Sequence, residues 1–108
     1  MEMERPTEEG RETFRALAPE APGVTVRAMF GNLAAFVNGN MFMALYGDRV
    51  AFKMDATDLA RARARDDAEP FGPGGRTMRE YVAFPLAAPD LEPWIEGSLA
   101  YVGTLPPK

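Results

Sequence analysis

Residues 24–54 carry the clearest alternation of apolar and polar positions in the chain. Over residues 24–30 the alternation has a period of two, which is typical of a half-buried strand. Three further apolar runs of strand length follow, at residues 33–37, 40–46 and 49–54. The pattern therefore predicts four consecutive antiparallel strands.

Short polar dipeptides between these runs favour tight turns. Asn38-Gly39 is the strongest of them, because a type I′ hairpin turn needs positive φ at both central residues. Gly47-Asp48 favours a type II′ turn, which needs positive φ at its first central residue. Gly31-Asn32 marks a further turn, so the four strands are expected to form a meander.

Two-residue turns also fix which residues face each other across neighbouring strands. Asn38-Gly39 is expected to place Ala35 opposite Phe42, and Gly47-Asp48 is expected to place Leu45 opposite Val50. On this register one face is entirely apolar and is predicted to be the core face beneath the helices: Ala34, Phe36, Met41, Met43, Leu45, Val50, Phe52 and Met54. The other, which we call the mixed face, is apolar with a basic rim: Leu33, Ala35, Val37, Phe42, Ala44, Tyr46, Arg49, Ala51 and Lys53.

Helices are predicted before and after the meander along the chain. The first covers residues 7–18, and the second covers residues 56–67 with Asp55 as its N-cap. A fifth strand is predicted over residues 78–84, and Asp90 is expected to cap a last helix. The last helix carries a stripe with helical spacing: Leu91, Trp94, Ile95, Leu99 (or Ser98 in its place) and Val102.

These elements predict a single α+β domain over residues 1–108, in the order α-β-β-β-β-α-β-α. Its antiparallel meander of four to five strands has helices packed on one face. The length is close to the commonest domain size. Hydrophobic residues make up 46% of the sequence and charged residues 26%, which are ordinary values for a globular protein.

The residue types that are missing exclude several kinds of chemistry. The chain has no Cys and no His, which excludes disulfides, thiolate nucleophiles, Cys/His zinc sites and histidine acid–base catalysis. The formal net charge of −4 disfavours a surface built wholly for nucleic acid. The acidic start is unlike a signal peptide, and no apolar run is long enough to cross a membrane, so a cytoplasmic location is expected.

Three local clusters invite a chemical interpretation, but each has a simpler structural one. Residues 72–76 are rich in glycine yet match no phosphate-loop motif, so a turn is favoured. The acids Asp66, Asp67 and Glu69 are expected to be a solvated helix end rather than a metal or acid–base site. Arg61, Arg63 and Arg65 are expected to form surface ion pairs, with Arg61 and Arg65 on one helix face.

Lys53 is the one candidate for Schiff-base chemistry, since it stands between Phe52 and Met54. No acid–base partner for it is evident in the sequence, and a surface or interface lysine is favoured. We therefore predict no catalytic residue, no metal site and no cofactor.

Several short motifs together resemble the N-terminal domain of the TfoX/Sxy competence regulators, over about residues 24–101. They are Met29-Phe30-Gly31, Phe36-Val37-Asn38-Gly39, Met41-Phe42, Phe52-Lys53, Phe71, Met78-Arg79-Glu80-Tyr81, Pro85 and the Trp94 helix. The resemblance implies a compact two-layer α+β domain similar to secretion-chaperone folds, with a curved antiparallel sheet and helices on one face. It also implies a regulatory role linked to competence or transcription, and it supplies no catalytic residue.

We predict a non-enzymatic regulatory or protein-interaction domain that forms a homodimer and binds a protein partner of unknown identity. The proposed interface is the mixed face, where Leu33, Val37, Phe42 and Tyr46 would leave an apolar patch unless a second copy covered it. Phe42→Glu is accordingly expected to split the dimer and leave the helices intact. The predicted interface residues are Arg27, Leu33, Val37, Phe42, Tyr46, Arg49 and Lys53.

Two other functions compete with this prediction. Aromatic residues beside basic ones on the mixed face would suit single-stranded nucleic acid or a small ligand. A small-molecule or acyl-transfer enzyme that uses Lys53 or a tyrosine is the other alternative, and a cleft with a buried ionisable group would favour it.

Overall fold

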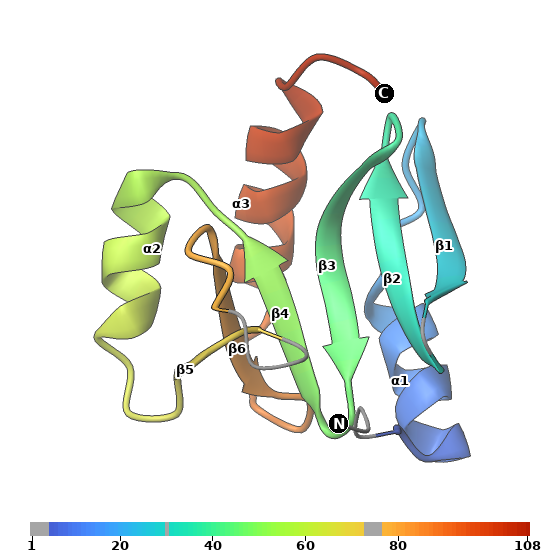
Figure 1. Ribbon diagram of the computed structural model, residues 1–108, viewed down its shortest axis with the longest axis vertical. Helices are drawn as coiled ribbons and strands as arrows, with labels where there is room; N and C mark the ends of the chain where they lie inside the picture. The colour runs from blue at the N-terminus through green and yellow to red at the C-terminus, as the bar shows by residue number, and fades with distance from the viewer. Residues whose placement is uncertain (1–4, 30, 73–76) are drawn as a thin grey trace.

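The computed structural model describes residues 5–29, 31–72 and 77–108 (Figure 1). Within these residues the chain forms three helices and a six-stranded sheet. The elements are α1 (Glu8–Leu17), β1 (Val24–Met29), β2 (Asn32–Val37), β3 (Asn40–Tyr46), β4 (Arg49–Lys53), α2 (Ala56–Arg63), β5 (Glu69–Pro70), β6 (Tyr81–Pro85) and α3 (Glu92–Gly103). The strand order is β1-β2-β3-β4-β6-β5 with antiparallel neighbours, so the predicted α+β class is confirmed.

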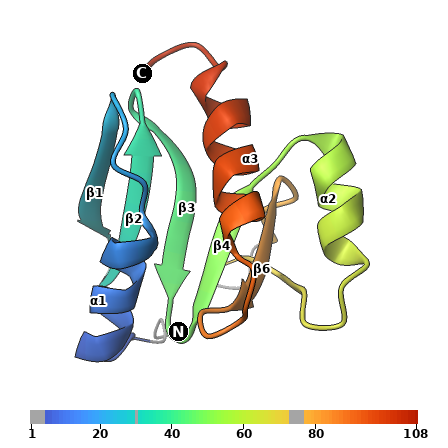
Figure 2. The same ribbon diagram turned by 180° about the vertical axis from the view of Figure 1, so that it is seen from behind.

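The helices and the sheet form two layers. Helices α1 and α3 cover one face of the sheet, and α2 lies to the side, beyond β6 (Figure 2). The main core lies between the layers, where Phe14 of α1 and Ile95 and Val102 of α3 meet the sheet. Among the described residues, no helix is long and apolar enough to span a membrane.

Thr7, at the predicted start of the first helix, and Asp55, the predicted cap of the second, both act as N-caps. The Thr7 hydroxyl accepts a hydrogen bond from the Gly10 N–H at 3.0 Å, and the Asp55 carboxylate accepts one from the Asp58 N–H at 2.9 Å. The cap predicted at Asp90 is wrong. Asp90 has a φ of 61°, and the helix begins at Glu92, with Leu91 at the N-cap position and no side-chain cap bond.

Two other boundaries differ from prediction by more than one residue. Helix α2 ends at Arg63, four residues before the predicted end, and β6 begins at Tyr81 rather than at residue 78. The segment before β6 instead makes backbone bonds of its own, because the Met78 N–H donates to the Phe71 carbonyl at 2.7 Å. This closes the loop between β5 and β6.

Both hairpin turns have the predicted backbone. Asn38 and Gly39 have φ values of 52° and 85°, as a type I′ turn requires, and Gly47 has a φ of 61°. The register of β3 with β4 follows from the second turn, with Leu45 opposite Val50. The sequence prediction is confirmed for this pair of strands.

The register of β2 with β3 departs from prediction at a β-bulge. Phe36 lies opposite Met41 as expected, but Ala35 lies opposite Met43 and not opposite Phe42. Phe42 is the extra residue, and its carbonyl accepts a 2.8 Å hydrogen bond from the buried Ser98 hydroxyl of α3. One extra residue shifts the alternation of side chains by one position.

Because of the bulge, several residues lie on the opposite face of the sheet from the one predicted. Leu33, Val37 and Phe42, which were predicted on the mixed face, belong to the core beneath the helices. Conversely, Ala34, Phe36 and Met41 were predicted in that core and belong to a second cluster on the opposite side of the sheet. The residues of β3 beyond the bulge and those of β4 keep their predicted faces, because the second hairpin alone sets their phase.

Candidate interaction surface

The face of the sheet away from α1 and α3, which we call the open face, has its own apolar cluster. Four alanines form a row across its central strands, because Ala34 lies opposite Ala44, Ala44 opposite Ala51, and Ala51 opposite Ala83. Each is at most 5% exposed. Larger residues frame the row on this side of the sheet: Met29, Phe36, Met41, Tyr46, Phe71 and Tyr81.

The chain covers part of the open face with its own residue Phe71. The Phe71 ring lies edge-on to Tyr46, with 6.1 Å between centroids, and 5.5 Å from the ring of Tyr81. Phe71 follows β5, and the sequence prediction placed it in a loop without assigning it a contact. The sequence signal that singled it out is its place among the motifs of the family resemblance.

The basic residues predicted at the rim do lie on the open face, but each is engaged within the chain. Arg49 forms an ion pair with Glu69, and the Lys53 ammonium lies 3.4 Å from a Glu80 carboxylate oxygen. The Arg27 guanidinium lies over the Phe36 ring, 4.0 Å from its centroid. Two of these three basic residues are therefore paired with an acid, and the third lies over an aromatic ring.

The structure separates the seven predicted interface residues into two groups. Four of them share the open face: Arg27, Tyr46, Arg49 and Lys53. Leu33, Val37 and Phe42 are buried in the helix-covered core. Of the four residues in the apolar patch that motivated a dimer through the mixed face, only Tyr46 therefore lies on the open face.

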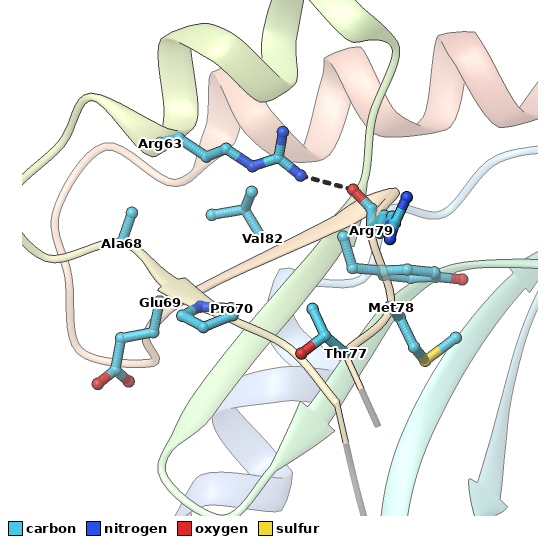
Figure 3. Close-up of a pocket in the computed structure, with 9 residues that line it drawn as sticks. Arg63, Ala68, Glu69, Pro70, Thr77, Met78, Arg79 and Val82 are labelled. Atoms are coloured by element: carbon cyan, nitrogen blue, oxygen red, sulfur yellow. Dashed lines mark hydrogen bonds between the residues drawn. The ribbon is translucent and has the colours of Figure 1, made fainter. Parts of the chain in front are cut away.

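A pocket of about 290 Å³ lies between α2 and the β5–β6 loop (Figure 3). Arg63 of α2 spans it, because its Nη2 donates a 2.6 Å hydrogen bond to the Arg79 carbonyl. Figure 3 shows Glu69 directed away from the pocket, consistent with its ion pair to Arg49. The described lining thus contributes arginines, apolar groups and the Thr77 hydroxyl, but no carboxylate positioned as a general base beside a nucleophile.

Tyr81, which also lines this pocket, is held in its protonated form. Burial raises the pKa of Tyr81 well above its usual value, and the nearby Glu80 charge raises it further. Its hydroxyl donates to the Met41 carbonyl at 3.3 Å, which fixes the ring against β3. A phenol in this state is poorly suited to act as a nucleophile or a base near neutral pH.

The charged clusters singled out in the sequence are divided among separate partners. Arg65 binds Asp67 through two hydrogen bonds of 2.9 and 2.7 Å, which lower the pKa of Asp67 and raise that of Arg65. Arg61 and Arg65 share one side of their segment as predicted, over Trp94 and Phe84 respectively. Within the described ranges, no three acidic residues are grouped to hold a metal ion. Residues 73–76 of the glycine-rich segment lie outside the described residues.

The two edges of the sheet differ sharply, which the sequence did not reveal. The β5 edge is two residues long and includes Pro70, which has no N–H to offer. The β1 edge is six residues long with four exposed residues, and no other strand in the described part of the chain pairs with its outer side. Val26, at its centre, is 37% exposed and is one of only two large apolar side chains so exposed among the described residues.

The ladder between β1 and β2 determines which backbone groups of β1 point outward. The Asn38 N–H donates to the Gly23 carbonyl at 3.0 Å, so at this position the backbone groups of the two strands point toward each other. Alternation along an antiparallel ladder then directs the N–H and C=O groups of Val24, Val26 and Ala28 outward. The Val24 N–H is already used, because it donates to the Ala21 carbonyl at 3.1 Å.

Comparison with known proteins places this fold in a family. No curated protein and no solved structure matches the chain. A family model described as the TfoX N-terminal domain matches residues 15–101, which include every strand of the described sheet, all of α2, most of α3 and only the last three residues of α1. Since that match covers most of the 108 residues, the chain belongs to the TfoX N-terminal domain family.

Proposed function

We propose that this chain is a non-enzymatic regulatory domain that acts by pairing its β1 edge with a strand of another polypeptide. The family to which it belongs suggests a competence-related regulatory setting. The observation that carries the proposal is the unpaired β1 edge with its free outward groups at Val26 and Ala28.

Pairing with an added strand is a recognised mode of polypeptide recognition, because main-chain hydrogen bonds supply affinity and alternate side chains supply specificity. Folded proteins usually block long edges with charge, proline or a bulge. The β5 edge is protected in this way, whereas β1 has a single charged residue, Arg27, whose guanidinium is drawn onto Phe36. The outer side of β1 is therefore suited to a partner strand.

The contacts on the open face favour a polypeptide partner over single-stranded nucleic acid. A stacking platform needs exposed rings beside free cations. Phe36, Phe71 and Tyr81 are at most 8% exposed, and both Arg49 and Lys53 have acidic partners. This arrangement supports the protein-interaction proposal and lends little to the alternative.

The test compares two substitutions at one position on the edge. Val26→Pro removes the outward N–H but no ladder bond to β2, and proline is tolerated on an edge strand. Val26→Thr keeps both the N–H and the β-branched shape, so it is the matched control. Circular dichroism and urea unfolding establish that both variants are folded.

The functional readout is complementation in cells that lack the gene. We expect deletion to change the transcript profile and the frequency of DNA uptake, and Val26→Thr to restore both as the wild type does. Val26→Pro is expected to restore neither, whereas Lys53→Met is expected to complement fully because no lysine chemistry is involved. Full complementation by Val26→Pro, no effect of the deletion, or loss of function in Lys53→Met would each overturn the proposal.

A further inference from the structure

The strand that pairs with β1 is, we infer, β1 of a second copy of this chain, centred on Val26 and related by a two-fold axis perpendicular to the sheet. This inference rests on the proposed function, because it names the partner for the same edge. It replaces the mixed face as the dimer surface, since Leu33, Val37 and Phe42 are buried in the core.

The outward backbone groups of β1 complement themselves in this register. With Val26 opposite Val26 of the second copy, each Val26 N–H faces the other copy's Val26 carbonyl. Each Ala28 N–H then faces the Val24 carbonyl of the other copy, so every free outward donor of β1 finds an acceptor. The Val24 N–H, which is bonded to Ala21, is the one outward donor that the pairing does not use.

Shifted registers are less favourable for reasons visible in the strand. A shift of two residues in one direction opposes Arg27 to Arg27 of the second copy, and like charges directly opposite destabilise a sheet. A shift of two residues in the other direction places Val24 opposite Val26 and Ala28 opposite Pro22, which precedes the strand, so fewer residues of the two β1 strands pair. In the Val26-centred register Arg27 instead faces Thr25, which carries no charge.

The side chains fit the same arrangement. Val24, Val26 and Ala28 share the face of β1 that points toward the helix layer, since they lie opposite Val37, Ala35 and Leu33 of the core. The pairing therefore places the exposed Val26 against its own copy and Ala28 against Val24. The axis perpendicular to the sheet keeps the helices of both copies on one side, which joins the two sheets into one.

Arg27 does not oppose this approach. Its side chain lies on the open face with its guanidinium 4.0 Å from the centroid of Phe36, a residue of the neighbouring strand β2. The positive charge is thus directed away from the outer edge and toward the interior of its own sheet. An isologous interface requires one patch to be complementary to itself, and β1 meets this condition.

Cysteine cross-linking can test both the partner and the register, because the natural chain has no cysteine. Val26→Cys is expected to form a disulfide-linked dimer under mild oxidation. Arg27→Cys alone is expected not to, since the two Arg27 positions are offset by two residues, which is beyond the about 7 Å Cα separation that a disulfide spans. A mixture of Thr25→Cys and Arg27→Cys is expected to form the mixed disulfide.

Light scattering supplies the independent measurement on the unmodified chain. We expect the mass to rise with concentration from 11.8 kDa toward twice that value. Val26→Thr should follow the wild type and Val26→Pro should remain monomeric. A wild-type mass that stays at 11.8 kDa up to about 1 mM, or rapid cross-linking of Arg27→Cys alone, would overturn the inference.

The two proposals fail in different ways. If the wild type is monomeric but Val26→Pro still abolishes complementation, the edge binds an unlike polypeptide, and only the inference about the second copy is lost. If the wild type is dimeric through Val26 but Val26→Pro complements fully, the dimer stands and the regulatory role of the edge is lost.

Discussion

Ser98 is expected to be a main determinant of the bulge that sets the face of β2. It is the only serine in the sequence, it is fully buried in α3, and its hydroxyl donates to the Phe42 carbonyl at 2.8 Å. Phe42 is the extra residue of the bulge and is itself 0% exposed. Ser98→Ala therefore removes a buried donor from a carbonyl that water cannot reach.

The size of the effect follows from two opposing contributions. A buried carbonyl that loses its partner costs about 1–3 kcal/mol, whereas alanine gains up to about 0.5 kcal/mol over serine through its helix propensity. We expect Ser98→Ala to lower the free energy of unfolding by about 1–2 kcal/mol. For a domain of this size, each kcal/mol corresponds to a fall in Tm of roughly 4–8 °C.

The assay is urea unfolding followed by circular dichroism, with Thr13→Ala as the matched control. Thr13 also donates its hydroxyl to a backbone carbonyl, that of Glu9 at 3.0 Å, but it does so on the exposed surface of α1. Its removal should change the free energy of unfolding by less than about 0.5 kcal/mol. Equal unfolding midpoints for the two variants would refute the assignment of Ser98 as the partner that stabilises the bulge.

Three other substitutions or conditions test the fold. Gly39→Ala should lower the free energy of unfolding in urea by at least about 1 kcal/mol, because residue 39 has a φ of 85° and a Cβ there would lie 2.8 Å from the Lys108 carbonyl oxygen. Gly103→Ala is the control and should not lower it, since the space around Gly103 is open. Burial raises the pKa of Tyr81, so as the pH rises the tyrosine loses its proton in the unfolded state before it does in the folded state. The free energy of unfolding should therefore fall above about pH 10, and Tyr81→Phe should remove this dependence in unfolding measured at several pH values. Phe42→Glu should abolish the folded circular dichroism spectrum rather than split a dimer, since it places a carboxylate in the core, and an intact spectrum would contradict the register of β3.

Local chemistry in the sequence determined much of the architecture. The turns at residues 38–39 and 47–48 follow from the need for positive φ, and the face of β4 follows from the second turn. The caps at Thr7 and Asp55 follow from side chains that bond to the next free N–H groups. Each of these features depends on residues within a few positions of one another, so the sequence alone sufficed.

Only the tertiary structure decided which face Leu33, Val37 and Phe42 occupy. The hairpin turn is compatible with a regular ladder, and the carbonyl of the bulged residue Phe42 is bonded to Ser98, which lies 56 residues further along the chain. Likewise, alternation in residues 24–30 predicted a strand, but its position at the sheet edge depends on β6 inserting beside β4 and leaving β1 as the outermost strand. Period-two alternation indicates that a strand has two different faces, but it does not determine which strands lie beside it. The free β1 edge therefore became evident only from the order of all six strands in the sheet.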